Sequence, residues 1–356
     1  MALSKRYQKT KKSFDAGGMS DVEVYTDVHL ERDVVIKALR DGIDSRRLLD
    51  EIAALQTIRS KHVVQMYDVV KNERDDVVAI VEEYIPGDDL TSCPKPATAI
   101  EFLYLIYQIA EGIADIHAHG QIHRDIKRQN MKFDAEGCLK IFDFGLARSS
   151  ASASTIGERG TPGYMAPELF EITAGGHVTF TTAVDVFAFG ATAAALALGS
   201  VPKPMRETPP ILPCDEADFS KLPIKLPTEI ASTLNRCLSK DWSDRPSMSE
   251  VVELVRLYLL RDKHRALLVS GTSAYSLHSG NRTVVLSVVN QGSITINYDG
   301  LRFLINAVSG SVAINNMAAV AGNALPGSCV IVLGSGANGA QRTSITVDVS
   351  HPELAL

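Results

Sequence analysis

Hydrophobic and polar residues alternate in two different ways along the first part of the chain. Short runs of alternating apolar residues predict β-strands at 22–25, 34–38 and 77–82, around one helical pattern at 46–58. Longer patterns with apolar residues every three or four positions follow, and they predict helices. The clearest of these are 97–118 and 183–198. We therefore expect a small β-rich lobe followed by a larger helical lobe.

The pattern changes again near Lys263. From Arg265 onward, short alternating stretches are separated by Gly, Asn and Ser, and lysine is absent. The stretches are 283–289, 293–297, 301–307, 311–315, 329–333 and 343–350. Repeated strands with polar turns indicate an all-β sandwich or barrel. The expected class is therefore α+β, with one domain at 1–263 and a small all-β domain at 264–356.

Composition and charge support a folded chain of this kind. The chain has 356 residues, which exceeds one average domain, and 45% of them are hydrophobic against 22% charged. The net charge of −6 disfavours a protein whose main task is to hold nucleic-acid phosphates. The basic residues at the N-terminus have two interpretations, a nucleic-acid arm or the solvated face of a strand.

The spacing of the cysteines and the apolar stretches of the sequence indicate the cellular compartment of the protein. The five cysteines are widely spaced and form no C-x-x-C, so they predict neither a zinc site nor a disulfide framework. They fit a reducing cytoplasm. The first thirteen residues lack the apolar stretch of a secretory signal. The most apolar stretch, 184–201, contains Asp185, and we interpret it as a buried helix and expect no membrane span.

Four motifs supply the groups that phosphoryl transfer requires. Transfer of the γ-phosphoryl group of ATP needs donors for the phosphates, ligands for a metal ion and a carboxylate for the acceptor hydroxyl. The motifs are V-V-I-K at 34–37, H-R-D-I-K-R-Q-N at 123–130, D-F-G at 143–145 and A-P-E at 166–168. A single tripeptide is a weak signal, whereas the ordered set is specific.

Together these motifs resemble the eukaryotic-like protein kinases, in particular the bacterial Ser/Thr kinases, over residues 6–262. The resemblance implies a bilobal fold with an N-lobe at 1–84 and a C-lobe at 85–263. It implies Mg²⁺- and ATP-dependent phosphorylation of Ser and Thr in a protein substrate. It also implies autophosphorylation, which a homodimer would carry out in trans. The basic N-terminus aligns with the family's first strand, which favours the solvated strand face.

The resemblance assigns a role to each residue of the catalytic loop. Asp125 is the expected catalytic base, and Lys127 is expected to neutralise charge on the γ-phosphate. Asn130 and Asp143 are expected to hold Mg²⁺, and Asp143 also faces the nucleotide. Capping of a turn is the alternative for a single Asp or Asn, but the complete set favours catalysis.

A lysine and a glutamate from the small lobe complete the set. Lys37 is expected to contact the α- and β-phosphates and to pair with Glu51 of the following helix. Their separation of 14 residues is shorter than usual for the family, which predicts a trimmed loop before the helix. Four other matched residues are expected to brace the fold: His123 and Asp185 at the catalytic loop, and Glu168 with Arg245 as a buried ion pair.

The loop that covers the phosphates departs from the family's glycine pattern. Gly17 and Val22 match the pattern, Gly18 follows, and Ser20 replaces the third glycine. Asp15 replaces the first glycine, and its carboxylate would repel a triphosphate. We therefore expect lower nucleotide affinity, or an Asp15 side chain that turns away.

The expected adenine pocket contains two unusual charges. Val35 belongs to this pocket, and Glu83 and Ile85 are expected to bind the adenine edge through their backbones. Glu82 occupies the gatekeeper position and Lys132 the floor, where the family has apolar residues. Because a buried lone charge costs several kcal/mol, we hypothesise that these two side chains pair. The alternatives are that both reach solvent, or that the alignment is one residue off.

The segment between the D-F-G and A-P-E motifs is the expected site of regulation. Arg124 precedes the catalytic aspartate, and in the family such an arginine pairs with a phosphate on this segment. We predict Thr155 as the autophosphorylation site, with one of Ser149–Ser154 second; the alternative is a plain small-residue loop. Thr161 is expected to contact Asp125 and to favour Ser or Thr as acceptor.

The C-terminal part resembles a second family. Residues 310–316 and 325–334 are similar to the second half of a forkhead-associated domain, which is a β-sandwich. The family's phosphothreonine-binding arginine and S-x-x-H motif are not evident. We therefore expect a sandwich that does not bind phosphothreonine and that serves docking or dimerisation.

The sequence is compatible with two functions of different classes. The first is an active Mg·ATP-dependent Ser/Thr kinase. The second is a pseudokinase scaffold, which the altered glycine loop and the charged adenine pocket would suit. Five retained side chains favour the enzyme: Lys37, Glu51, Asp125, Asn130 and Asp143.

Overall fold

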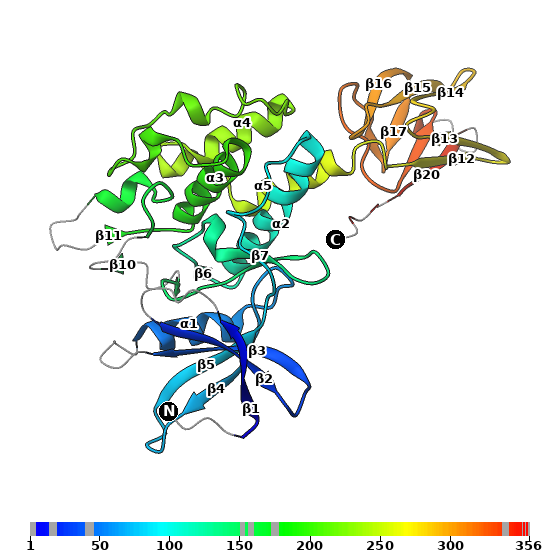
Figure 1. Ribbon diagram of the computed structural model, residues 1–356. Helices are drawn as coiled ribbons and strands as arrows, with labels where there is room; N and C mark the ends of the chain where they lie inside the picture. Colours follow the sequence, from blue (N-terminus) through cyan, green and yellow to red (C-terminus); the bar gives the residue numbers. More distant parts are fainter. Residues whose placement is uncertain are drawn as a thin grey trace. The chain divides into compact units, whose positions relative to one another are not determined.

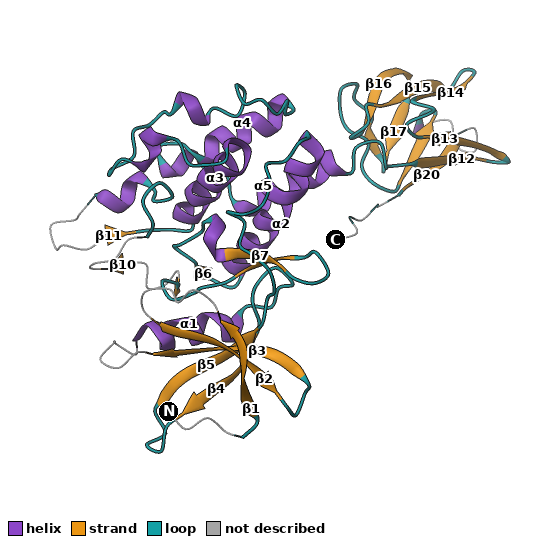
Figure 2. Ribbon diagram, in the orientation of Figure 1, coloured by secondary structure: helices purple, strands orange, loops and turns teal. Residues whose placement is uncertain are grey.

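The computed structural model describes residues 5–13, 20–39, 46–149, 154–155, 160–171, 178–336, 342–350, 352 and 354. The chain divides into two compact units, Met1–Val255 and Arg256–Leu356. Figure 1 shows the order of their elements along the chain, and Figure 2 shows where helices and strands lie.

In the small lobe of the first unit, the residues that the structure describes form an antiparallel sheet of five strands with one helix. The strand order is β1-β2-β3-β5-β4. The elements are β1 (Tyr7–Ser13), β2 (Ser20–Asp27), β3 (Arg32–Leu39), α1 (Arg46–Thr57), β4 (Met66–Lys71) and β5 (Val77–Glu83). Side chains alternate across the strands, so Val34 and Ile36 lie in one apolar cluster, whereas Ile80 packs on the other face against Leu48 and Ile52 of α1.

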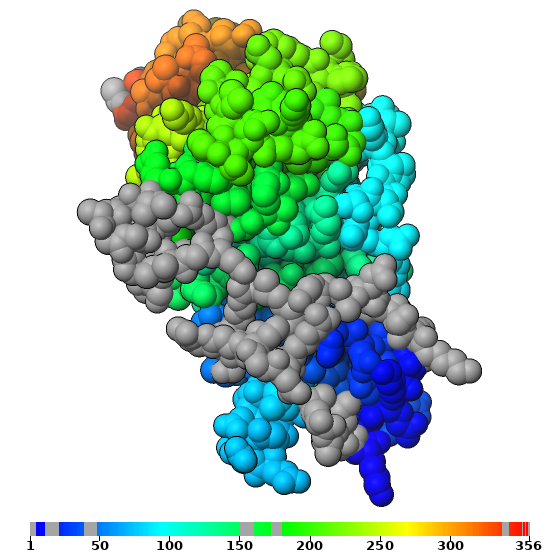
Figure 3. Space-filling model, turned by 60° about the vertical axis from the view of Figure 1, so that its left-hand side comes forward, coloured from blue at the N-terminus to red at the C-terminus, as the bar shows by residue number. Residues whose placement is uncertain are grey.

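Four helices form most of the described part of the larger lobe, which Figure 3 draws mainly in green. They are α2 (Ala99–Ala118), α3 (Ala183–Leu198), α4 (Thr228–Cys237) and α5 (Met248–Leu259). Helix α2 begins at Thr98, whose side chain accepts a hydrogen bond from the N–H of Glu101. Helix α3 ends at Gly199, whose φ of +96° is the left-handed conformation that favours glycine.

Helix α3 is buried along its whole length except at Leu198. This confirms the interpretation of the apolar stretch as a buried helix, because a helix enclosed by protein needs apolar residues all round. Among the residues that the structure describes, no helix combines the length and apolar character needed to cross a membrane.

Short strands and 3₁₀ turns connect these helices, and several of the sequence motifs lie at the ends of these short elements. The strands pair as β6 with β9, β7 with β8 and β10 with β11. Their bounds are β6 (Gln121–Ile122), β7 (Met131–Phe133), β8 (Leu139–Ile141), β9 (Arg148–Ser149), β10 (Ser154–Thr155) and β11 (Val178–Thr179). The 3₁₀ turns are η1 (Arg128–Asn130), η3 (Pro167–Phe170), η4 (Lys203–Arg206), η5 (Asp215–Ala217) and η6 (Trp242–Asp244).

The expected ion pair between Glu168 and Arg245 is present. The guanidinium of Arg245 donates two parallel hydrogen bonds to the carboxylate, of 2.7 and 2.8 Å, and it also bonds the carbonyl of Ala183 at 2.8 Å. Such a bidentate pair is directional as well as charged. It therefore ties η3, which follows the activation segment, to the start of α3.

The second unit contains the predicted β-sandwich. One sheet has the order β13-β12-β20-β19-β17-β18 and the other the order β14-β15-β16. Side chains of both sheets, such as Leu268, Ile296 and Ile331, share one core. The strands are β12 (Ala266–Ser270), β13 (Ser273–Leu277), β14 (Thr283–Val288), β15 (Gly292–Tyr298), β16 (Phe303–Gly310), β17 (Val312–Ile314), β18 (Met317–Ala318), β19 (Cys329–Leu333) and β20 (Thr343–Val349).

Candidate active site

Lys37 joins three separate parts of the first unit. Its ammonium lies 2.8 Å from the carboxylate of Glu51 on α1 and 3.1 Å from Oδ1 of Asp143, in the loop after β8. The Glu51 side chain is only 2% exposed, and it also accepts a hydrogen bond of 3.0 Å from the N–H of Phe144. The sheet, the helix and the D-F-G segment are thus held in one arrangement.

The charges at this junction support one another. Burial alone would lower the pKa of Lys37, but the carboxylates of Glu51 and Asp143 outweigh it and raise that pKa above its usual value. Burial would raise the pKa of Asp143, and Lys37 lowers it below its usual value instead. Lysine and aspartate are therefore both ionised at neutral pH, as binding of phosphates and a cation requires.

Asp125 lies at the centre of a second polar network. Its carboxylate accepts hydrogen bonds from the ammonium of Lys127 at 2.7 Å, from the hydroxyl of Thr161 at 2.7 Å and from the amide of Asn130 at 3.0 Å. Lys127 also donates to the hydroxyl of Thr161 at 2.8 Å. The expected contact between Thr161 and the catalytic-loop residues is confirmed.

Asp185 braces the backbone of the catalytic loop from inside the helical lobe. Its fully buried carboxylate accepts the backbone N–H groups of His123 and Arg124, each at 2.8 Å, and lies 3.0 Å from Nε2 of His117. Burial would raise the pKa of Asp185, but the hydrogen bond from His117 and further charges keep it below the usual value. The bracing role expected for Asp185 is therefore confirmed.

Two oxygen donors are placed to hold a divalent cation. The amide nitrogen of Asn130 donates to both the carbonyl and the carboxylate of Asp125, at 2.8 and 3.0 Å, so the amide oxygen points elsewhere. The side chain of Asp143 is 47% exposed. Because Mg²⁺ prefers carboxylate and carbonyl oxygens together with substrate phosphates, this donor set fits a nucleotide-bound magnesium ion.

Strand register identifies the side chains that share a face with Lys37. Val22 lies directly opposite Lys37, and Val35 lies directly opposite Glu82, so these residues point to the same side of the sheet. Ile85 follows β5 and is 5% exposed. These apolar side chains and the backbone after β5 are the groups expected to hold the adenine ring.

The hypothesis that Glu82 pairs with Lys132 is wrong. The charges that act on Glu82 are those of Glu51, Lys37 and Asp143, and Lys132 is not among them. Lys132 lies on β7, near the charges of Asp88 and Asp89, and its ammonium is 5.9 Å from the centre of the Phe142 ring. Burial lowers the pKa of Lys132, and the two aspartates oppose that shift.

Glu83 and Arg124 have partners that sequence reasoning did not specify. The carboxylate of Glu83 lies 3.1 Å from the ammonium of Lys140. The guanidinium of Arg124 lies 4.3 Å from the centre of the Phe180 ring. Burial and the charge of Arg148 lower the pKa of Arg124 to about 10, so it remains a cation at neutral pH.

Some predicted residues lie outside the described part of the chain. Gly17 and Gly18 belong to this group, as does Asp15. Thr155 is described as backbone only, in strand β10, where it pairs with Val178 of β11. The expected roles of these residues remain predictions.

An ion pair between α1 and β9 was missed. The guanidinium of Arg148 lies 2.7 Å from the carboxylate of Asp50. The signal in the sequence was an acidic residue beside Glu51 and a basic residue five positions after Asp143. This contact holds the helix that carries Glu51 against the start of the activation segment.

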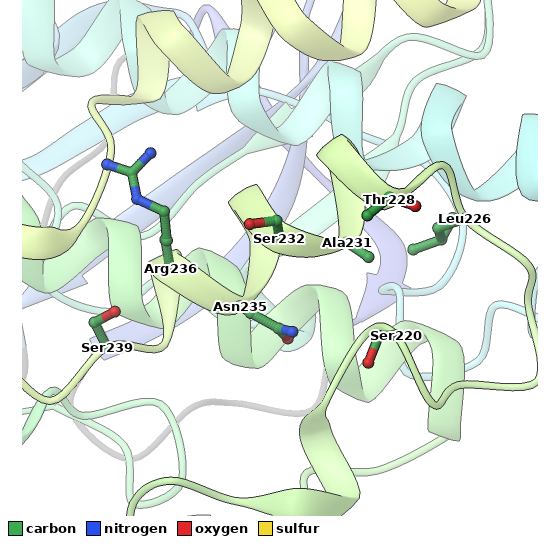
Figure 4. A pocket seen from close by; sticks show the side chains of 8 residues that line it. All are labelled: Ser220, Leu226, Thr228, Ala231, Ser232, Asn235, Arg236 and Ser239. Carbon is green, nitrogen blue, oxygen red and sulfur yellow. The ribbon is translucent and has the colours of Figure 1, made fainter.

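A pocket of about 460 Å³ lies on α4 and contains none of the catalytic residues (Figure 4). It is lined mainly by short polar side chains, with Arg236 among them. Its larger polar groups already have structural partners: Nε of Arg236 donates to the carbonyl of Asp244 at 3.1 Å, and the amide of Asn235 donates to Asp218 at 2.8 Å. We assign no function to this pocket.

Comparison with known proteins agrees with this geometry. Residues 9–255 match the family described as the protein kinase domain. This range is more than half of the chain and contains every residue of both polar networks. The chain therefore belongs to the protein kinase family.

Among its relatives is the serine/threonine-protein kinase PrkC of Bacillus subtilis, 32% identical over 56% of this chain and 31% of the relative. Another is the serine/threonine-protein kinase hippo of Drosophila melanogaster, 29% identical over 73% of this chain and 40% of the relative. A third, drp72 of Corynebacterium efficiens, is 31% identical over 68% of this chain and 49% of the relative. The matches thus span between about a third and a half of these relatives.

Proposed function

We propose that the chain is a serine/threonine protein kinase that transfers the γ-phosphoryl group of Mg·ATP to hydroxyl groups of a protein substrate. The observation that carries this proposal is the convergence of two networks, one around Lys37 and one around Asp125. Together they supply the lysine, the metal ligands and the carboxylate that the reaction needs. A scaffold without activity would have no use for so complete a set.

Each residue has a defined part in this reaction. Asp125 accepts the proton of the acceptor hydroxyl, whose oxygen forms the new bond to the γ-phosphorus while the bond to the departing ADP breaks. Lys127 neutralises charge on the transferred group, and Lys37 contacts the α- and β-phosphates. Asn130 and Asp143 bind Mg²⁺, which offsets the negative charge of the phosphates.

The proposal also covers the choice of acceptor residue and the regulation of the kinase through its activation segment. Thr161 bonds both Asp125 and Lys127, which supports Ser and Thr as acceptors. Arg124 remains cationic and would pair with a phosphate on the activation segment, with Thr155 as the proposed site. Transfer between two copies of the chain would place that phosphate in trans.

The remaining parts of the proposal concern the rest of the chain. We propose domains at 1–263 and 264–356, the second a forkhead-associated-like sandwich for docking or dimerisation. The five cysteines are all unpaired, which supports a reducing compartment such as the cytoplasm.

The experiment is a transfer assay with the full chain and ATP that is radiolabelled on its γ-phosphate. A generic acceptor protein is included, and one arm contains a chelator in place of Mg²⁺. We expect label on phosphoserine and phosphothreonine, and none in the chelator arm. A folded chain that transfers no label with any divalent cation would instead be a scaffold.

A further inference from the structure

Glu82 is a buried acidic residue with an unpaired carboxyl oxygen in the described part of the chain. The residue is 6% exposed, and its Oε1 atom makes no hydrogen bond there. Leaving a buried polar atom unpaired is unfavourable, because the atom has lost its hydrogen bonds to water and gained none in the protein. Because nearly all buried polar atoms in proteins have a partner, an exception points to a functional role or to a bound group.

The position of Glu82 indicates which ligand could satisfy it. On β5 it lies directly opposite Val35, and Lys37 lies two residues further along β3 on the same face. The next residues, Glu83 to Ile85, form the segment proposed to contact the adenine ring. Glu82 is therefore located between the proposed phosphate-binding lysine and the proposed adenine-binding backbone.

The nearby ammonium is already occupied. Lys37 lies 2.8 Å from Glu51 and 3.1 Å from Asp143, and no hydrogen bond joins it to Oε1 of Glu82. Burial, and then the charge of Glu51, raise the pKa of Glu82 to about 8, against the opposing effect of Lys37. The raised pKa favours the protonated, neutral carboxyl group at neutral pH. This form offers both an O–H donor and a carbonyl acceptor.

We propose that Glu82 determines which nucleobase the site accepts, by a hydrogen bond from the 6-amino group of adenine to its carboxyl group. This inference rests on the proposed kinase function. Adenine presents an amino donor and the N7 acceptor along one edge, which match the carbonyl and the hydroxyl of a neutral carboxyl group. Hypoxanthine and guanine present two acceptors there, so one of the two hydrogen bonds cannot form.

The experiment measures dissociation constants of the full chain for ATP and for inosine triphosphate, which has an oxygen in place of the 6-amino group. The variants are Glu82→Gln, whose amide has the same donor and acceptor pair as a neutral carboxyl, and Glu82→Met, which has neither. Glu73→Met is the matched control, because Glu73 is exposed in the turn between β4 and β5.

We expect the preference for ATP over inosine triphosphate to fall about tenfold in Glu82→Met and to persist in Glu82→Gln and Glu73→Met. Without nucleotide, Glu82→Met should melt at a higher temperature than the wild type, because the unpaired polar atom is gone. A wild-type preference unchanged in Glu82→Met would overturn the inference and leave the proposed function intact. Failure of the folded wild type to bind either nucleotide would overturn both.

Discussion

Two residues of the active site have left-handed backbone conformations although neither is glycine. The φ angle is +70° at Arg124 and +67° at Asp143. Such conformations cost about 1 kcal/mol or more and persist where surrounding contacts hold them. Asp185 accepts the N–H of Arg124, and Lys37 binds the carboxylate of Asp143. One of these contacts belongs to the network around Lys37, and the other braces the catalytic loop that carries Asp125.

Glu82 should make stability depend on pH. Its pKa is about 8 in the folded chain against 4.5 for a free glutamate side chain, so the folded state holds a proton that the unfolded state releases between these values. The free energy of unfolding should therefore fall as pH rises through this window, by up to about 1.4 kcal/mol per pH unit from this group. Urea unfolding of wild type and Glu82→Gln from pH 5 to 9 measures the difference.

In Glu82→Gln this contribution is absent, since the amide does not titrate, so its stability should fall less steeply than that of the wild type. All other titrating groups are common to the two chains. Equal slopes for both proteins would show that Glu82 is ionised in the folded state.

Motifs were sufficient to identify most residues of the site, but not every contact. Lys37 and Glu51 were paired from motif spacing, and the structure joins them at 2.8 Å. The pairing of Glu82 with Lys132 was wrong because the two side chains lie among different charges: Glu82 near Lys37, Glu51 and Asp143, and Lys132 near Asp88 and Asp89. Glu82 shares its face with Val35, and no motif records that register.

At the scale of elements, the orientation of α1 depends on contacts made by two neighbouring acidic residues. Glu51 bonds Lys37 and the N–H of Phe144, and its neighbour Asp50 lies 2.7 Å from Arg148 on β9. The second pair is partly exposed, with side chains 36% and 26% accessible. This ion pair between two side chains of the chain holds α1 to the activation segment.

Removal of either partner should weaken catalysis modestly. We expect Asp50→Ala and Arg148→Ala each to lower kcat/KM about two- to fivefold, because a partly exposed pair contributes up to about 1 kcal/mol. The double variant should be no worse than either single variant, which a double-mutant cycle measures. Lys71→Ala is the control, because it breaks an exposed pair with Asp75. Fully additive losses would contradict a direct coupling.

Elements with long, regular patterns were predicted best. The predicted helix at 183–198 has the bounds of α3, because its apolar character is continuous and Gly199 ends it. Strands β12 and β13 were missed, and β13 is exposed at four of its five positions. A strand at the edge of a sheet shows little alternation of apolar and polar residues. It is identified by its pairing with a neighbouring strand, and not by its sequence pattern.

At the scale of the whole molecule, the chain contains two units that each have their own apolar core. The sandwich draws its core from both of its sheets, and the residues from Arg265 onward contain few charges and no lysine. The site described above lies entirely within the first unit. Nucleotide should therefore stabilise one unit only.

Calorimetry of the full chain tests whether nucleotide stabilises only one of the two units. We expect two unfolding transitions, of which only one moves to higher temperature when Mg²⁺ and a non-hydrolysable ATP analogue are added. The shift should grow with the logarithm of the analogue concentration above its dissociation constant. A single transition, or equal shifts in two, would contradict independent cores.

The most direct test of the account compares wild type with Asp125→Asn in two assays, binding of Mg·ATP and transfer of its γ-phosphate to an acceptor protein. Asparagine keeps a carbonyl oxygen that can accept the hydrogen bond from Asn130, and Asp125 does not contact Lys37 or Glu51, so the variant should bind Mg·ATP like the wild type. Without the carboxylate that accepts the proton, transfer should fall by about 10²- to 10⁴-fold. Transfer at the wild-type rate by the variant would contradict the assignment of this site.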